Sequence, residues 1–247
     1  MTSPWVDQES IDAVKMYTRI TTITDDHETR IAALEAAALQ VEHLLLPLPS
    51  VTAPAFGFLL GLTSGAGGGF AAAVGEIGHP GIVSMSTGTT NTGRVALRTD
   101  HAAVILDPAA ALTVAEWVIK IPTLSTGSER YALRCGFLDA DTGAPTDGVY
   151  FEYDDSASAN WRIAARTGGS GTPSSTSTAV AAGTWYTLRA EVTGTTSAEF
   201  LINSVSVGTV SSNVPGAGAA FGLSMHIAKS VGTTSRSVLV DKGSLQV

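Results

Sequence analysis

The chain has 247 residues, with 14 Lys and Arg against 22 Asp and Glu and a formal net charge of −8. This balance argues against a nucleic-acid partner, because binding to phosphates requires clustered basic side chains. Only 15% of the residues are charged. The abundance of Gly, Ala, Ser and Thr is typical of turn-rich β structure.

No apolar run reaches the roughly 18 residues that a membrane-spanning helix needs, so no membrane insertion is expected. The first ten residues lack the basic start and the apolar block of a secretory signal. We therefore expect a soluble protein that is not exported by the general route. The single cysteine, Cys135, excludes an internal disulfide, and its place on the apolar side of an alternating run indicates an inert core residue.

Residues 1–49 are predicted to form a docking segment followed by an α-helical coiled-coil stalk. The residues of the helix seam follow the heptad rhythm of alternating steps of three and four. They are Ile20, Thr24, His27, Ile31, Leu34, Ala38, Val41, Leu45 and Leu48. A polar seam residue such as His27 fixes the register at a cost in stability, and we interpret it as a stacked or hydrated layer rather than as a metal ligand. Pro47 and Pro49 end the helix because each lacks an amide donor.

Within this stalk, Arg30, Ile31, Leu34 and Glu35 resemble the Arg-apolar-x-x-apolar-Glu signature of short three-stranded coiled coils. Arg30 and Glu35 flank the seam, where they can pair with a neighbouring helix and bias the number of strands. The sequence therefore predicts a homotrimer. The alternative is a single amphipathic helix that packs on its own domain.

Residues 50–75 are predicted as an apolar, Gly-rich connector. The run Ala55–Leu62 is apolar and punctuated by glycine, and Ser64–Gly69 has the composition of a flexible linker. Three copies of the chain could bury this apolar run around a common axis.

From residue 76 to residue 247 the hydrophobic period changes to two, which predicts a separate β head. Short segments with one apolar side each are divided by turn clusters. The segments are residues 116–121, 130–138, 149–154, 160–166, 185–192, 198–202, 205–210, 221–227 and 238–240. Many short strands of this kind predict a mainly-β fold, an antiparallel sandwich of two sheets.

Three blocks of this head resemble the concanavalin-like (laminin-G-like) jelly-roll domains of tailed-bacteriophage virion proteins. The blocks are 78–83 with 86–94, 136–153 with 160–161, and 182–188 with 199–203. The Gly-x-Trp-Tyr-x-Leu and Phe-x-Ile-Asn motifs mark the fold in general, whereas the His-Pro-Gly and Ser-Thr-Gly-Thr-Thr motifs are closer to the phage members. Asn203-Ser204 stands where the family usually has Asn-Gly, a departure that concerns a hairpin and not the function.

The resemblance implies a virion surface protein without a cofactor: a short trimeric fibre, a head fibre or a capsid decoration protein. It also implies a head that can attach to host-surface glycans. The N-terminal segment would then dock on other virion proteins, either of the capsid or of the tail.

One alternative is a tail receptor-binding protein that degrades polysaccharide. Strand alternation places Glu152 and Asp154 on one face, in a partial match to the Glu-x-Asp-x-Glu strand of retaining glycosidases with a related fold. Such enzymes need two catalytic carboxylates about 5–5.5 Å apart. Ser156 stands at the third position here, so we expect no enzymatic activity.

A glycan-binding face is the other hypothesis for the head. Five side chains would leave the core on the same side if their strands share one sheet: Tyr150, Glu152, Asp154, Arg162 and Trp185. Sugars stack on aromatic rings and form hydrogen bonds with carboxylates and guanidinium groups. The alternatives are that Trp185 lies under a loop and that Glu152 pairs with Arg162 on a solvated strand face.

Asp139, Asp141 and Gly143 form a fragment of a calcium-binding loop. The bidentate Glu that completes such a loop is missing. We interpret the segment as a turn and predict no metal site.

Overall fold

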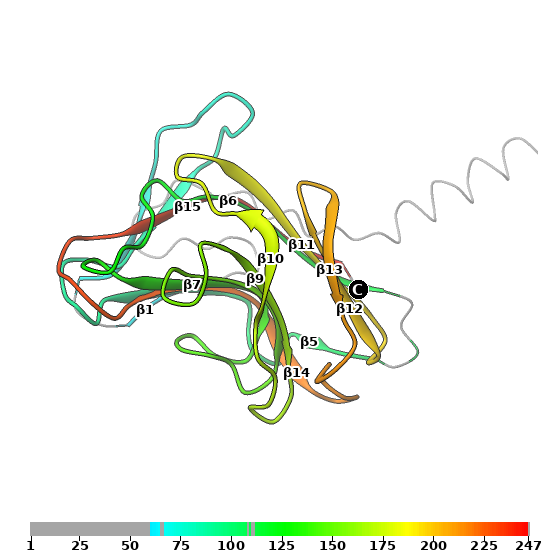
Figure 1. Ribbon diagram of the computed structural model, residues 1–247. Helices are drawn as coiled ribbons and strands as arrows, with labels where there is room; N and C mark the ends of the chain where they lie inside the picture. Colours follow the sequence, from blue (N-terminus) through cyan, green and yellow to red (C-terminus); the bar gives the residue numbers. More distant parts are fainter. Residues whose placement is uncertain (1–59, 65–66, 108, 110–111, 247) are drawn as a thin grey trace, which may run out of the picture. The chain divides into compact units, whose positions relative to one another are not determined.

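The computed structural model describes residues 60–64, 67–107, 109 and 112–246. The predicted stalk and all of its seam residues lie outside this part of the chain. Every regular element in the described residues is a β-strand (Figure 1). None of these residues forms a helix with the length and hydropathy of a membrane span.

The described residues form fifteen strands. They are β1 (Leu60–Ser64), β2 (Gly69–Ala72), β3 (Val83–Ser86), β4 (Arg94–Arg98), β5 (Val104–Ile105), β6 (Thr113–Lys120), β7 (Tyr131–Leu138), β8 (Gly148–Asp154), β9 (Asn160–Arg166), β10 (Ser174–Ala179), β11 (Trp185–Thr193), β12 (Ser197–Ile202), β13 (Val205–Val210), β14 (Ala220–Lys229) and β15 (Ser237–Gln246).

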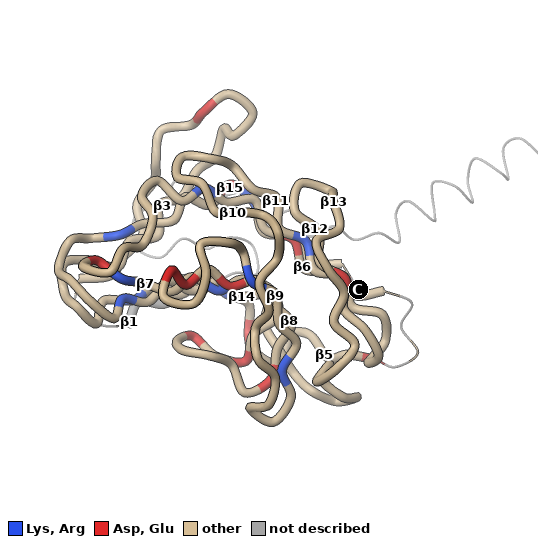
Figure 2. The backbone as a smooth tube through the Cα atoms, in the orientation of Figure 1, with Lys and Arg blue, Asp and Glu red and all other residues tan. Residues whose placement is uncertain are grey.

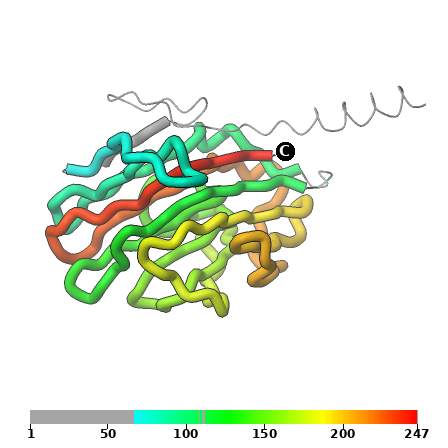
Figure 3. The backbone as a smooth tube through the Cα atoms, turned by 90° about the horizontal axis from the view of Figure 1, so that it is seen from above, coloured from blue at the N-terminus to red at the C-terminus, as the bar shows by residue number. Residues whose placement is uncertain are grey.

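The strands form two antiparallel sheets that face each other, which confirms the predicted sandwich. The eight-stranded sheet has the order β1-β4-β14-β7-β8-β9-β10, with β5 paired to β14. The seven-stranded sheet has the order β13-β12-β11-β6-β15-β3-β2, and its neighbouring strands run side by side in Figure 3. The edge strands β10 and β13 contact each other, so β1 and β2 form the opposite side of the sandwich.

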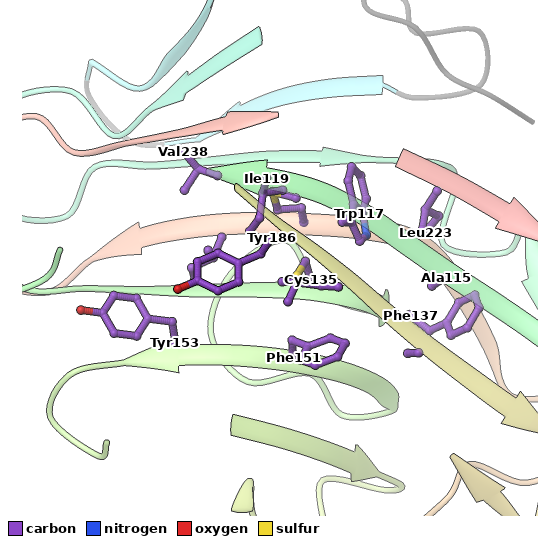
Figure 4. Packing of buried hydrophobic residues seen from close by; sticks show 14 of the residues in the cluster. Ala115, Trp117, Ile119, Cys135, Phe137, Phe151, Tyr153, Tyr186, Leu223 and Val238 are labelled. Atoms are coloured by element: carbon purple, nitrogen blue, oxygen red, sulfur yellow. The ribbon is translucent and has the colours of Figure 1, made fainter. Parts of the chain in front are cut away.

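Alternate residues of both sheets fill the space between them. Trp117 and Ile119 from one sheet meet Cys135, Phe137 and Phe151 from the other, and all five side chains are buried (Figure 4). Each large apolar side chain buried in this way contributes about 1.5–3 kcal/mol. Cys135 therefore lies in the core as predicted, and burial raises the pKa of its thiol well above the usual value.

The sandwich begins before residue 76, the boundary predicted from periodicity. Strands β1 and β2 both lie within the segment predicted as a connector, residues 50–75. Residues 69–72 pair with β3 through their backbone groups, and this pairing needs no alternation of apolar side chains. Strand β10 also had no sequence signal, because Ser174–Ala179 consists of Ser, Thr and Ala and carries no apolar period.

Candidate functional site

Glu152 lies at the centre of a charged row on the outer face of the eight-stranded sheet. The strand register places Arg134, Glu152 and Arg162 opposite one another on β7, β8 and β9. The Nε of Arg134 donates to one carboxylate oxygen of Glu152 at 2.7 Å, and Arg162 donates to the other. Glu152 is only 3% exposed. Both of its oxygens are therefore engaged. The expected pairing with Arg162 is confirmed, but the strand face at Glu152 is buried and not solvated.

The neighbouring candidates on β8 are also engaged within the fold. Tyr150 is fully buried against Leu138 and Ala164, and this burial raises the pKa of its phenol. Asp154 accepts hydrogen bonds from the backbone N–H of Ser156 at 3.0 Å and from its hydroxyl at 2.6 Å. Tyr150 therefore packs within the covered face, and Asp154 stabilises the turn after β8.

His226 on β14 belongs to the same covered face. The register places it beside Arg134, and the backbone of Ala140 and Gly143 in the β7–β8 loop interacts with its ring. Burial, helped by the charge of Arg134, lowers the pKa of His226 to about 3, so its ring is neutral at physiological pH. Sequence reasoning missed His226, since nothing in the alternation pattern indicates that a loop covers the outward side of β14.

The two aspartates of the calcium-like fragment have different partners. Asp139 accepts hydrogen bonds from the backbone N–H groups of Thr146 and Asp147, at 3.0 Å each. Asp141 forms an ion pair with Arg98 at 2.8 Å. The described part of the chain contains no group of three or more His, Cys, Asp and Glu side chains suited to a metal ion.

Trp185 lies on the other sheet, so the five predicted glycan-face residues do not share one face. The candidates Tyr150, Glu152, Asp154 and Arg162 belong to β8 and β9, whereas Trp185 begins β11. The prediction of one common face assumed that these strands belong to one sheet. Alternation along a strand does not show which sheet the strand joins.

A hairpin loop, residues 73–82, covers part of Trp185, as the alternative interpretation expected. His79 from this loop stacks on the indole with ring centroids 3.9 Å apart and an interplanar angle of 17°. The indole Nε1–H of Trp185 donates to Glu76 at 3.0 Å. His79 is fixed in turn by Asp241, whose carboxylate lies 2.7 Å from its Nδ1.

Lys120 completes this group, which we call the Trp185 cluster: Glu76, His79, Lys120, Trp185 and Asp241. The Nζ of Lys120 lies 5.0 Å from the centroid of the Trp185 ring and forms an ion pair with Glu76. Hydrogen bonds from Lys120 and Trp185 lower the pKa of Glu76. The indole is only partly buried, and its orientation is set from two sides.

A second set of charges continues from the Trp185 cluster along the same outer face. Arg189 lies four residues after Trp185 on β11, on the same side of the strand. It pairs with Glu191 at 2.5 Å and with Glu116 at 3.5 Å. Lys242 reaches Glu116 from β15 at 3.1 Å. The face thus offers an oriented aromatic ring next to partly exposed charges of both signs, which suits a ligand rich in hydroxyl groups.

Comparisons with known proteins agree with this architecture. A structure described as a protein of unknown function, SO2946 from Shewanella oneidensis MR-1, has a TM-score of 0.58 at 15% identity and 81% coverage of each chain. The Emp46p carbohydrate recognition domain has a TM-score of 0.55 at 11% identity, covering 83% of this chain and 96% of that one. The TM-scores show a shared lectin-like sandwich fold, and at such low identity they show the fold alone.

A structure of botulinum neurotoxin type C, described by the dependence of its cell entry on two ganglioside molecules, has a TM-score of 0.54 at 9% identity. The match covers 82% of this chain and 46% of the toxin chain, so this chain spans about half the length of that structure.

A search of curated proteins finds no matching sequence. Residues 78–241, more than half of the chain, match the model of one family. This chain therefore belongs to the family described as SO2946-like, C-terminal domain.

Proposed function

We propose that this chain is a homotrimeric, non-enzymatic protein on the surface of a tailed-phage virion, and that its head binds host-surface glycans. The heptad seam with Arg30 and Glu35 supports the trimer, and the His-Pro-Gly and Ser-Thr-Gly-Thr-Thr motifs support the virion origin. Residues 1–49 dock on other virion proteins, of the capsid or of the tail. The lectin-like sandwich supports the role of the head.

The glycan site that we propose is the Trp185 cluster with the adjoining charges of Arg189 and Glu116. The observation that carries this proposal is the partly buried indole of Trp185, held in one orientation by His79 and Glu76. A ring that is already fixed loses little conformational entropy when a sugar contacts it. The nearby guanidinium and carboxylate groups can then form hydrogen bonds with sugar hydroxyls.

Binding without cleavage fits the geometry around Glu152. A retaining glycosidase needs two free carboxylates on either side of the glycosidic bond. Glu152 is buried and gives both oxygens to arginines, while Asp154 is engaged by Ser156. We therefore propose that the head holds its glycan and does not hydrolyse it.

The test is binding of the full-length chain to a panel of immobilised bacterial surface polysaccharides. Trp185→Ala and Arg189→Ala should each weaken the binding of any positive polysaccharide by about tenfold, which corresponds to about 1.4 kcal/mol. Asp154→Ala, on the outer face of the other sheet, is the matched control and should bind like the wild type.

Two results would overturn the proposed site. One is a folded wild-type chain that binds no polysaccharide of the panel. The other is a loss of binding in Asp154→Ala that Trp185→Ala does not share. Release of reducing ends from a bound polysaccharide would instead support the polysaccharide-degrading alternative.

A further inference from the structure

The edge of the seven-stranded sheet at β2 exposes small and apolar side chains. Ala71 and Ala72 at the end of β2 are exposed, Val74 is 90% exposed, and Ile77 at the tip of the hairpin loop is fully exposed. We call these four residues the β2 edge. The loop stands out beyond the strands as the cyan segment in Figure 1.

This edge lacks the charges that normally protect a sheet edge from pairing. From Gly67 to Gly78 the single charged residue is Glu76 (Figure 2). Its carboxylate is engaged by Lys120 and Trp185. The segment contains no proline and no lysine either. An uncharged edge with exposed apolar side chains can pack against another molecule without burying a charge.

The tip of the loop is also held in shape. The backbone groups of Glu76 and His79 exchange two hydrogen bonds of 2.9 Å, and Gly78 between them has a positive φ of 83°. The ring of His79, which stacks on Trp185 and is hydrogen-bonded to Asp241, ties this turn to β11 and β15. A preformed apolar tip loses little entropy on docking, which favours binding.

The position of the β2 edge indicates which molecule covers it. Strands β10 and β13 contact each other on one side of the sandwich, so β1 and β2 lie on the other side, where the chain arrives from residues 1–59. The predicted stalk ends near Leu48, and the 12 residues from there to Leu60 span at most about 40 Å. The chain therefore enters each sandwich on the same side as the β2 edge, within reach of the other copies joined to it.

We propose that the β2 edge docks against the same edge of a second copy of this chain. The contact is apolar and needs no new ion pair, in agreement with the absence of free charge along this segment. The inference rests on the proposed trimer and adds a second interface to it, formed by the heads.

The first test measures how strongly the full-length chain associates. Val74→Ser combined with Ile77→Ser should raise the concentration at which the oligomer dissociates by at least about tenfold, since two exposed apolar side chains lose their burial. The matched control combines Ile105→Ser with Val205→Ser, which are 58% and 65% exposed elsewhere on the sandwich. The control should dissociate like the wild type, and both variants should keep the wild-type melting temperature.

The second test uses the fact that the one native cysteine, Cys135, is buried. Ile77→Cys should form crosslinks between copies with a short bismaleimide, whereas Val205→Cys should not. A wild-type chain that is monomeric at all concentrations would overturn both this inference and the proposed trimer. An oligomer that neither dissociates more easily in the Val74/Ile77 variant nor crosslinks through Ile77→Cys would overturn this inference alone.

Discussion

Glu152 supplies the negative charge that Arg134 and Arg162 share across β8. Glu152→Ala would leave two largely buried guanidinium groups facing each other without a counter-charge. Removing one partner of a buried ion pair costs about 3–5 kcal/mol, so we expect the free energy of unfolding to fall by that order. Urea denaturation followed by circular dichroism measures it.

Glu199 on β12 provides the control for this change. It lies directly opposite Glu191, and like charges in facing positions are destabilising. Glu199→Ala should therefore leave the stability unchanged or slightly higher. Equal losses of stability in the two variants would contradict the role assigned to Glu152.

Glu129 fixes the loop after β14 through several hydrogen bonds. Its carboxylate accepts from the backbone N–H groups of Thr233 and Thr234, from the Thr234 hydroxyl and from Lys229. Burial acts to raise the pKa of Glu129, but the hydrogen bonds from Thr234 and Lys229 outweigh it and lower the pKa to about 2.

The sign of this pKa shift predicts how stability depends on pH. Because the folded pKa is below the unfolded value of 4.5, the carboxylate stabilises the fold fully above pH 4.5 and loses this effect as the pH falls toward 2. In Glu129→Gln the melting temperature should be lower at neutral pH and should fall less steeply between pH 4.5 and 2. Parallel melting curves for the two proteins across this range would contradict the assignment.

At the scale of elements, β6 and β15 approach each other where Trp117 packs over Gly243. A Cβ atom at Gly243 would lie 2.6 Å from the ring of Trp117, which is too close for any contact. Gly243→Ala should therefore destabilise the fold by about 1–3 kcal/mol, because the indole must move within a packed core. Gly216→Ala is the control, since a Cβ atom there meets nothing within 4 Å. Chemical denaturation of both variants makes the comparison, and equal stabilities would contradict the packing argument.

Individual strands could be predicted where alternation is strong. Asn160–Arg166 and Val205–Val210 were predicted with the bounds that β9 and β13 have. The inward positions Cys135, Phe137 and Phe151 were also predicted, because burial between two sheets selects one side of each strand. The Ser- and Thr-rich strand β10 was missed because it pairs through its backbone with side chains that show no preference for either face.

At the scale of the whole molecule, the assignment of strands to sheets could not be predicted. Alternation shows which side of a strand is buried, but β8 and β11 have equally clear patterns and belong to different sheets. The same limit explains Trp185, whose neighbours in space come from a loop more than 100 residues earlier in the chain. Long-range contacts of this kind leave no local signal, so the Trp185 cluster required the folded structure.

In the full-length chain, Ile31 occupies an a position of the predicted coiled-coil seam. An aspartate within a coiled-coil seam must be buried without a partner, so Ile31→Asp should convert the trimer into monomers. The wild type should have a mass of three times 25.3 kDa by sedimentation or light scattering, and the variant the mass of one chain. Ala33→Asp adds the same charge at a position outside the predicted seam and should remain trimeric. The head has its own core, so its melting temperature should not change in either variant. A trimeric Ile31→Asp variant would contradict the predicted seam. It would indicate that the heads hold the assembly together, through contacts such as the β2 edge.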